Sequence, residues 1–215
     1  MSGRHHGHRS PAPPVTKPPA LLLFDLGGVL VENTVFERLS ALLADAVDPA
    51  TLKRRWLASH SVRRFEVGEI GSEAFAESFI GEWRLALSPA EFIDEFRQWP
   101  RDFYPGARET LRVLRRRYRV GCLSNSNALH WRRFGGFADD FDIALSSHLL
   151  GALKPDAEIF ARALAACAVA PAAVWFFDDL PDNVAAAARL GMRAHQVEGF
   201  AATLAVLRST GVLPC

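Results

Sequence analysis

From residue 20 onward, short apolar runs alternate with segments of helical periodicity, and this alternation constrains the fold more than any other feature. Five runs are predicted as strands, at residues 20–24, 119–123, 141–145, 174–177 and 192–197. Helical segments follow four of them, at residues 127–134, 155–166, 182–190 and 200–208. Strands that alternate with helices form a parallel sheet through right-handed crossovers, with helices on both faces. The sequence therefore predicts an α/β fold with a Rossmann-like parallel sheet.

A long interval between the first two runs shows helical signals and no convincing strand. Ser88-Pro89-Ala90-Glu91 is a capping box with proline at the first helical position. An insert that follows the first strand should lie over the carboxyl ends of the strands, where functional groups collect. We therefore expect a helical cap subdomain at residues 33–102, inserted into an α/β core formed by residues 20–32 and 103–215. Most of the cap's aromatic residues are expected in its own small core, with one or two facing the cleft; they include Trp56, Trp83, Trp99, Phe65, Phe75, Phe79, Phe92 and Phe96.

The charge balance argues against a nucleic-acid partner, because 25 Lys and Arg residues against 24 Asp and Glu residues leave a net charge of +1. Binding to a phosphate backbone depends on a positive field that this chain lacks. The apolar run at residues 20–24 is far shorter than the roughly 20 residues of a membrane span, and it does not follow a signal-peptide pattern. We therefore expect a cytoplasmic protein that is not bound to a membrane, as a monomer or a homodimer.

Three widely spaced cysteines without a CxxC pair indicate neither a disulfide framework nor a structural zinc site. Residues 1–19 hold His5, His6, His8 and five prolines, with almost nothing apolar to bury. This composition predicts a disordered, partly polyproline-like tail. Metal binding by its three histidines is the alternative.

Polar residues follow the first two predicted strands. Asp25 comes directly after a buried run and is followed by Gly27 and Gly28, an arrangement that is costly unless the carboxylate is paired, bound to metal or exposed in a cleft. A tight turn is the alternative interpretation. The second strand ends in Ser124-Asn125-Ser126-Asn127, whose hydroxyls and amides could donate to an anion beside a helix N-terminus. In the alternative interpretation, Asn125 to Asn127 form a helix N-cap.

Charged residues follow the third and fourth predicted strands. Lys154 stands before a proline that begins a helix, and only three of the 25 basic residues in the chain are lysines. Lysine offers a compact point charge where arginine offers a planar fork. The adjacent carboxylates of Asp178 and Asp179 repel each other, and a hard cation such as Mg²⁺ would relieve that repulsion. Capping of the next helix would explain Asp182 but not this pair.

In combination, these segments resemble the haloacid dehalogenase-like (HAD) hydrolase superfamily over nearly all of residues 20–210. The matching motifs are FDLGGVL with Asp25, LSNSN with Ser124, LKPDAEIF with Lys154, and FFDDLPDNVAAAARLGM with Asp178, Asp179 and Asn183. The sequence is most similar to the branch with FDxGG or FDxGN at the first motif, which includes α-D-glucose-1-phosphate phosphatases and the phosphatase-like domains of some epoxide hydrolases. The interval at residues 33–102 resembles the C1 cap of that superfamily.

The resemblance implies a role for each strand-end residue. Asp25 would be the nucleophile that forms an aspartyl-phosphate. Mg²⁺ would be held by the Asp25 carboxylate, the Gly27 carbonyl and Asp179, and the phosphoryl group would be bound by Ser124, Asn125 and Lys154. Asp178 and Asn183 would contact these residues rather than the substrate. Asn183 would hold Lys154 or a metal-bound water. The implied function is Mg²⁺-dependent hydrolysis of a small phosphomonoester, with a sugar phosphate favoured.

The sequence departs from the superfamily at Gly27. Most phosphatases of the superfamily carry a second aspartate two residues after the nucleophile, which protonates the leaving alcohol and later activates water. General acid-base catalysis is typically worth 10²- to 10⁴-fold, or about 3–5 kcal/mol of barrier. Three explanations would account for the absence of this second aspartate: a better leaving group, slow turnover, or a substitute acid such as Glu32, His130 or a cap residue.

Three other functions stay open at this point. A 2-haloacid dehalogenase also uses an Asp nucleophile, without a general acid and without Mg²⁺. A phosphonatase would use a cap lysine as a Schiff base, but Lys53, the only lysine of the cap, lies in Lys53-Arg54-Arg55 and is predicted on a solvated helix face. A non-catalytic phospho-ligand-binding or protein-binding module that has lost turnover is the third.

Overall fold

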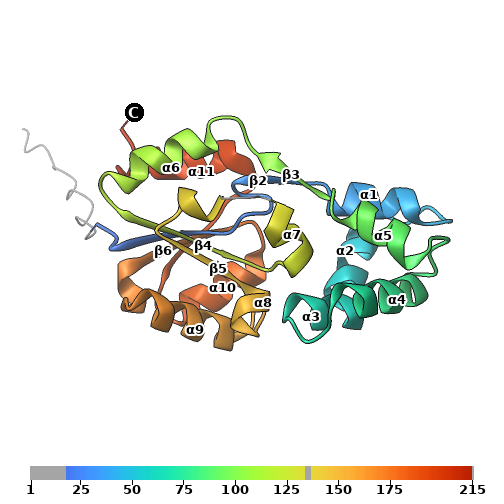
Figure 1. The fold of residues 1–215 in the computed structure, drawn as a ribbon. Helices are drawn as coiled ribbons and strands as arrows, with labels where there is room; N and C mark the ends of the chain where they lie inside the picture. Colours follow the sequence, from blue (N-terminus) through green and yellow to red (C-terminus); the bar gives the residue numbers. More distant parts are fainter. Residues whose placement is uncertain (1–17, 134–136, 215) are drawn as a thin grey trace, which may run out of the picture.

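The computed structural model describes residues 18–133 and 137–214 (Figure 1). Its strands are β1 (Leu21–Phe24), β2 (Val31–Asn33), β3 (Pro100–Phe103), β4 (Arg119–Ser124), β5 (Ile143–Ser146), β6 (Val174–Asp178) and β7 (Arg193–Gln196). Its α-helices are α1 (Val35–Leu42), α2 (Pro49–Leu57), α3 (His60–Glu66), α4 (Ser72–Trp83), α5 (Pro89–Phe96), α6 (Ala107–Arg115), α7 (Ala128–Arg133), α8 (Ser147–Leu150), α9 (Ala157–Cys167), α10 (Pro181–Arg189) and α11 (Gly199–Ser209). The tail predicted at residues 1–19, with its three histidines, lies almost entirely outside the described residues.

Five parallel strands form the central sheet in the order β5-β4-β1-β6-β7. β1 is the middle strand, with Phe24 opposite Cys122 of β4 and Phe177 of β6. The predicted α/β class is confirmed, and each of the five predicted runs agrees with one of these strands to within two residues at either end. Because the strands are parallel, the residues that follow β1, β4, β5 and β6 meet at one edge of the sheet.

Both faces of the sheet are buried under helices, which explains why its strands are nearly continuous apolar runs. Figure 1 shows α6 and α11 on one side of the sheet and α9 and α10 on the other. Leu22 and Phe24 of β1 pack in the cluster that contains α6 and α11, whereas Leu21 and Leu23 pack in the cluster that contains α9 and α10. The two-residue side-chain period of a strand produces this division.

The helices α1–α5, here called the helical insert, leave the core after β2 and return to it through β3. The insert packs around its own apolar cluster, in which Trp83 and Trp99 are fully buried. The predicted capping box at Ser88 is present, with both of its reciprocal hydrogen bonds to Glu91. The predicted aromatic core of this segment is therefore confirmed.

Two short strands were not predicted. β2 and β3 pair antiparallel, with Val31 opposite Phe103 and Asn33 opposite Pro100. The prediction that this interval contains no strand is therefore wrong. The pairing has a physical role, because it joins the two connections between sheet and helical insert into one ribbon.

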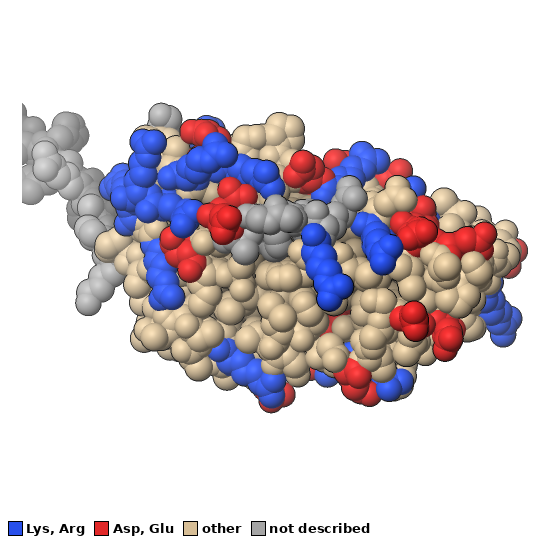
Figure 2. Space-filling view, viewed as in Figure 1, with Lys and Arg blue, Asp and Glu red and all other residues tan. Residues whose placement is uncertain are grey.

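The arginines of α6 lie beside acidic residues. Figure 2 shows basic residues gathered over α6 with acidic residues among them. Three arginines of α6 ion-pair with neighbouring carboxylates: Arg108 with Asp140 at 3.2 Å, Arg112 with Glu109 at 2.9 Å, and Arg115 with Asp142 at 2.9 Å. Within the described residues, every helix is too short or too polar to cross a membrane.

Candidate active site

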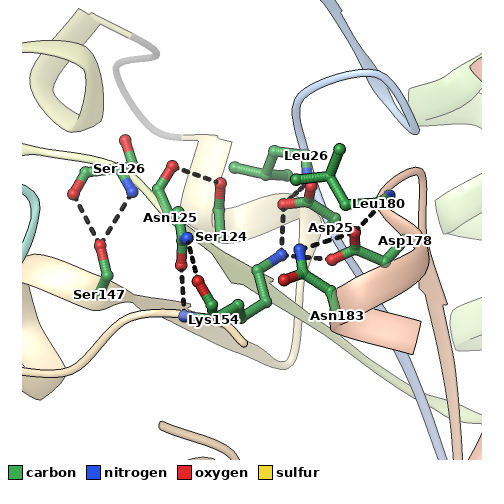
Figure 3. A network of polar contacts seen from close by, with 10 residues as sticks. All are labelled: Asp25, Leu26, Ser124, Asn125, Ser126, Ser147, Lys154, Asp178, Leu180 and Asn183. Atoms are coloured by element: carbon green, nitrogen blue, oxygen red, sulfur yellow. Dashed lines mark hydrogen bonds and ion pairs between the residues drawn. The ribbon is translucent and has the colours of Figure 1, made fainter. Parts of the chain in front are cut away.

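The polar residues predicted at four strand ends lie together in the structure (Figure 3). Asp25 follows β1, Ser124 ends β4, Asp178 ends β6, and Lys154 comes from the loop between α8 and α9. Each of these four side chains belongs to a residue that is buried, between 0% and 8% exposed. The parallel sheet brings Asp25, Ser124 and Asp178 to one edge, and the loop before α9 carries Lys154 to the same place.

Lys154 is the central cation of this group. Its Nζ lies 3.0 Å from Asp25 Oδ1 and 2.6 Å from Asp178 Oδ2, and its side chain is 1% exposed. Burial by itself would lower the pKa of Lys154, but Asp178 and Asp25 overcome that effect and hold the pKa above its usual range. The lysine is therefore charged and shared by two carboxylates.

Asn125 holds the backbone of Lys154 in place. Its Nδ2 donates to the Lys154 carbonyl and its Oδ1 accepts from the Lys154 N–H, both at 2.9 Å. The side chain predicted to bind phosphate is thus engaged in a two-point contact that positions the lysine. Asn127 caps α7 by accepting from the N–H groups of Leu129 and His130 at 3.1 Å. The helix-cap interpretation therefore applies to Asn127, while Ser124 faces the cleft.

Both oxygens of Asp178 are occupied. Oδ2 accepts from Lys154, and Oδ1 accepts from Leu180 N–H and Asn183 Nδ2, each at 2.9 Å. Asn183 therefore acts on Lys154 through Asp178 and makes no direct hydrogen bond to it. Asp182 lies inside α10, where no side chain caps the helix, so the predicted alternative role for Asp182 is wrong.

The carboxylate of Asp25 is only partly satisfied. Oδ1 accepts from Leu26 N–H at 2.8 Å and pairs with Lys154, whereas Oδ2 has no hydrogen-bond partner among the described residues. Burial raises the pKa of Asp25 to about 7, against the lowering effect of Lys154. Burial and the neighbouring Asp178 likewise raise the pKa of Asp179. The single positive charge of Lys154 therefore does not neutralise the three carboxylates of Asp25, Asp178 and Asp179.

This donor set fits a hard divalent cation. One carboxylate oxygen from each of Asp25, Asp178 and Asp179 lies within 4.8 Å of the others, and carboxylate oxygens are the ligands that Mg²⁺ prefers. Asp25 Oδ2 and the Asp179 carboxylate remain available, whereas Asp178 is saturated. Gly28, at φ +75°, lets Asp179 approach, because a Cβ there would lie 3.0 Å from Asp179 Oδ2.

Glu32 and His130, the two residues named from the sequence as substitutes for an acid at Gly27, both have partners within the protein. A Cβ on Gly27 would lie 3.2 Å from Asn33 Nδ2, so an amide occupies the space beside this glycine. Glu32 ion-pairs with Arg101 at 3.2 Å and lies outside the cavities of the site. Both ring nitrogens of His130 are engaged, Nδ1 with Asn127 and Nε2 with the carbonyl of Phe96.

A cleft between the sheet edge and the helical insert contains these groups. It comprises an inner cavity of about 170 Å³ and an adjoining cavity of about 330 Å³ that share several lining residues. Trp56 of α2 lines both, as expected of one cap aromatic residue. Lys53 also lines both, is partly buried, and lowers the pKa of Asp179 by its charge. The prediction that Lys53 lies on a solvated face is therefore wrong.

Sequence reasoning missed Glu66, the last residue of α3. This partly buried side chain lines both cavities and has no hydrogen bond or ion pair within the part of the chain that the structure describes. Burial raises the pKa of Glu66 to about 7, while Lys154 lowers it and Asp25 raises it. The sequence carries no strong signal for this residue, because only the docking of α3 decides which way it faces.

Comparison with known proteins adds family-level information. A family model described as "haloacid dehalogenase-like hydrolase" matches residues 19–191. Phosphatase MT3486 of Mycobacterium tuberculosis (strain CDC 1551 / Oshkosh) is 38% identical over 100 residues, which cover 44% of this chain and 46% of that protein. The chain spans less than half of the length of the curated relatives it matches.

Solved structures share the fold. A HAD family enzyme of Bacteroides thetaiotaomicron, bt-2542, superposes with a TM-score of 0.71 at 23% identity and covers 85% of this chain and 95% of its own. A complex of that enzyme with magnesium and inorganic phosphate gives a TM-score of 0.68. The L-2-haloacid dehalogenase PA0810 gives 0.58 at 23% identity, covering 84% of each chain.

Proposed function

This chain belongs to the haloacid dehalogenase-like hydrolases, and we propose that it is a Mg²⁺-dependent phosphatase acting on a small phosphomonoester. The observation that carries the proposal is a buried lysine paired with Asp25 and Asp178 at the strand ends, with the carboxylate of Asp179 within 4.8 Å of theirs. A site that hydrolyses phosphate esters needs a nucleophile, cations for the phosphoryl oxygens and a cleft for the rest of the substrate. All three are supported by the geometry.

Asp25 is the proposed nucleophile. Leu26 N–H and Lys154 Nζ both bind its Oδ1, so the carboxylate is held in one orientation beside the cleft. Attack on phosphorus would form an aspartyl-phosphate, which water would then hydrolyse. Ser124 and Lys154 would bind the phosphoryl oxygens, and Asn125 would keep Lys154 in position.

Asp25, the Gly27 carbonyl and Asp179 are the proposed Mg²⁺ ligands. The ion would supply positive charge to the phosphoryl oxygens during transfer. Asp178, whose oxygens are both engaged, would hold Lys154 and Asn183 in place instead of binding the ion. The magnesium and phosphate complex of the Bacteroides enzyme supports the choice of magnesium as the ion.

A sugar phosphate is the proposed substrate class, in line with the resemblance to α-D-glucose-1-phosphate phosphatases and epoxide hydrolase phosphatase-like domains. Lys53 and Trp56 on α2 face the cleft and would contact the part of the substrate beyond the phosphoryl group. A lysine ammonium and an indole can both hydrogen-bond to a polar leaving group, such as a sugar, but not to an apolar one. The helical insert would thereby act as the cap that selects the substrate.

A 2-haloacid dehalogenase is the second candidate. Gly27 provides no general acid, and halide leaves without a proton; the fold is also similar to that of a haloacid dehalogenase. The Asp178-Asp179 pair favours the phosphatase, because Lys154 pairs with Asp178 and only a metal-dependent reaction would place a cation beside Asp179 as well.

The test is phosphate release by the purified full chain from a panel of sugar phosphates, nucleotides and phosphoamino acids, with Mg²⁺ or with EDTA. We expect EDTA-sensitive turnover that Asp25→Asn abolishes. Asp94→Asn is the matched control, because that carboxylate is 74% exposed on α5 and pairs with Arg97. The absence of EDTA-sensitive release, or wild-type rates for Asp25→Asn, would refute the phosphatase, and metal-independent halide release from 2-haloacids would support the second candidate.

A further inference from the structure

Glu66 occupies the cleft from the opposite side to the strand-end residues. It ends α3 in the helical insert and lines both cavities, together with Asn125, Lys154 and Asn183 of the core. No ion pair or hydrogen bond within the described ranges holds its carboxyl group. A carboxyl group that faces a reaction centre without a structural partner is available to exchange a proton with a bound molecule.

The core holds α3 in place on two sides. Arg63 ion-pairs at 2.7 Å with Asp156, which stands directly before α9. At the end of the helix, Gly68 packs so closely on α8 that a Cβ would lie 2.6 Å from the His148 carbonyl oxygen. Between these contacts Phe65 is 2% exposed and stacks on Phe75, with ring centroids 4.2 Å apart. The position of Glu66 over the site is therefore set by packing.

Other titratable side chains of the cleft are already committed. Asp25 and Asp179 are the proposed nucleophile and metal ligand, and Lys154 is bound by two carboxylates. His130 uses both ring nitrogens within the protein. Asp182 lines the adjoining cavity but not the inner one.

The electrostatic setting of Glu66 agrees with a proton-transfer role. Burial is the main cause that raises its pKa to about 7, and the nearby charges of Lys154 and Asp25 act in opposite directions. A general acid works best when its pKa lies near the working pH. Asp25, Lys53, Lys154 and Asp179 are the other charged side chains that line the inner cavity.

We propose that Glu66 is the catalytic acid and base that this chain uses in place of the aspartate missing at Gly27. The inference rests on the proposed phosphatase function. In the first step an Asp25 oxygen bonds to phosphorus, the ester P–O bond breaks, and the leaving oxygen takes the proton of the Glu66 carboxyl. In the second step the Glu66 carboxylate takes a proton from water, the water oxygen bonds to phosphorus, and the bond to Asp25 breaks. Phosphate, the alcohol, free Asp25 and protonated Glu66 result.

Two substrates separate the steps in the full chain with Mg²⁺. An alkyl or sugar phosphate needs a proton on its leaving oxygen, whereas p-nitrophenyl phosphate does not. We expect Glu66→Gln to lower kcat/KM for the alkyl phosphate by about 10²- to 10⁴-fold. With p-nitrophenyl phosphate the same variant should release a burst of about one equivalent of nitrophenol and then turn over slowly, because the aspartyl-phosphate accumulates.

Glu69→Gln is the matched control, since Glu69 lies three residues further on, is 55% exposed and pairs with Arg64. It should behave as wild type on both substrates. If Glu66→Gln turns over both substrates within threefold of the wild-type rate and shows no burst, the role of Glu66 is overturned and the proposed phosphatase function stands. A wild-type protein that hydrolyses neither substrate would overturn the phosphatase, and the role of Glu66 with it.

Discussion

Replacing Lys154 by methionine tests whether one buried cation satisfies the carboxylates at the strand ends. The lysine side chain is 1% exposed, and its Nζ lies within 3.0 Å of Asp25 Oδ1 and 2.6 Å of Asp178 Oδ2. Methionine keeps an unbranched side chain and removes the charge, so both carboxylates stay buried without a counter-charge. Removing one partner of a buried ion pair typically costs about 3–5 kcal/mol of folding free energy.

Thermal unfolding in EDTA at pH 8 measures this cost. In a protein of this size each kcal/mol moves the midpoint by about 2–4 °C, so Lys154→Met should unfold roughly 6–20 °C below wild type. Lys53→Met is the matched control, because Lys53 lines the same cleft but makes no ion pair within the described residues. Its midpoint should stay within about 4 °C of wild type. A midpoint for Lys154→Met as high as that of the control would refute the reasoning.

Two further readouts sharpen the same test. Added Mg²⁺ should raise the midpoint of Lys154→Met more than that of wild type, because binding to the folded state stabilises it and the loss of a positive charge favours a cation. Burial opposes the ionisation of Lys154, but Asp178 and Asp25 hold its pKa above the usual 10.5. The contribution of the lysine is therefore complete below pH 10.5 and is lost as the pH rises through the folded-state pKa. Because Lys154 lowers the pKa of Asp25, that carboxyl ionises at a higher pH in the variant, and the difference between wild type and variant should grow from pH 8 to pH 9.

Three other predictions follow from single positions. Gly28 has φ +75°, and a Cβ added there would lie 3.0 Å from Asp179 Oδ2. Gly28→Ala should therefore lower the free energy of unfolding in urea by about 1–2 kcal/mol and weaken Mg²⁺ binding in calorimetry. Unchanged affinity for Mg²⁺ would show that Asp179 does not bind the ion. Ser88→Ala removes the capping box with Glu91 and should cost about 1 kcal/mol in urea while phosphate release stays at the wild-type rate. Glu66→Gln should be more stable than wild type above pH 7, by no more than about 3 kcal/mol, because a folded-state pKa raised from 4.5 to about 7 means that ionised Glu66 destabilises the fold. That difference should disappear as the pH falls below 4.5, and a constant difference in unfolding free energy across this range would contradict the raised pKa.

The central sheet was predictable because its strands are buried on both faces. Such strands must be apolar at successive positions, so a run such as residues 174–177 stands out from the sequence and agrees with β6 to within one residue. β2 and β3 carry no such signal, because they are short, and Arg101 and Asp102 of β3 are exposed. Their pairing depends on where the helical insert enters and leaves the core.

The strand-end residues were predictable for a related reason. Parallel strands place their carboxyl ends at one edge, so polar residues after β1, β4 and β6 had to meet. Which side chain bonds to which was not predictable. Asn125 binds the Lys154 backbone and Asn183 binds Asp178, and these choices depend on distances of a few ångströms between separate loops.

The insert side of the cleft was the least predictable part. Lys53 and Glu66 lie on helices with charged residues on several sides, so the sequence does not say which charges face inward. Their direction follows from contacts made after folding, such as the ion pair between Arg63 and Asp156. Sequence reasoning on a docked helix therefore identifies the helix but not the residue that reaches the site.

The ribbon of β2 and β3 makes the helical insert exchangeable. Because Asn33 lies opposite Pro100, the chain leaves the core and re-enters it at neighbouring points, about 5 Å apart in such a pair. Any folded segment whose ends meet at that distance could be grafted onto the ribbon without altering the five-stranded sheet. Such a chimera would recognise a different molecule and keep the atoms of the core that act on it. It would have to replace one contribution, the carboxyl group of Glu66, in order to keep the proposed chemistry.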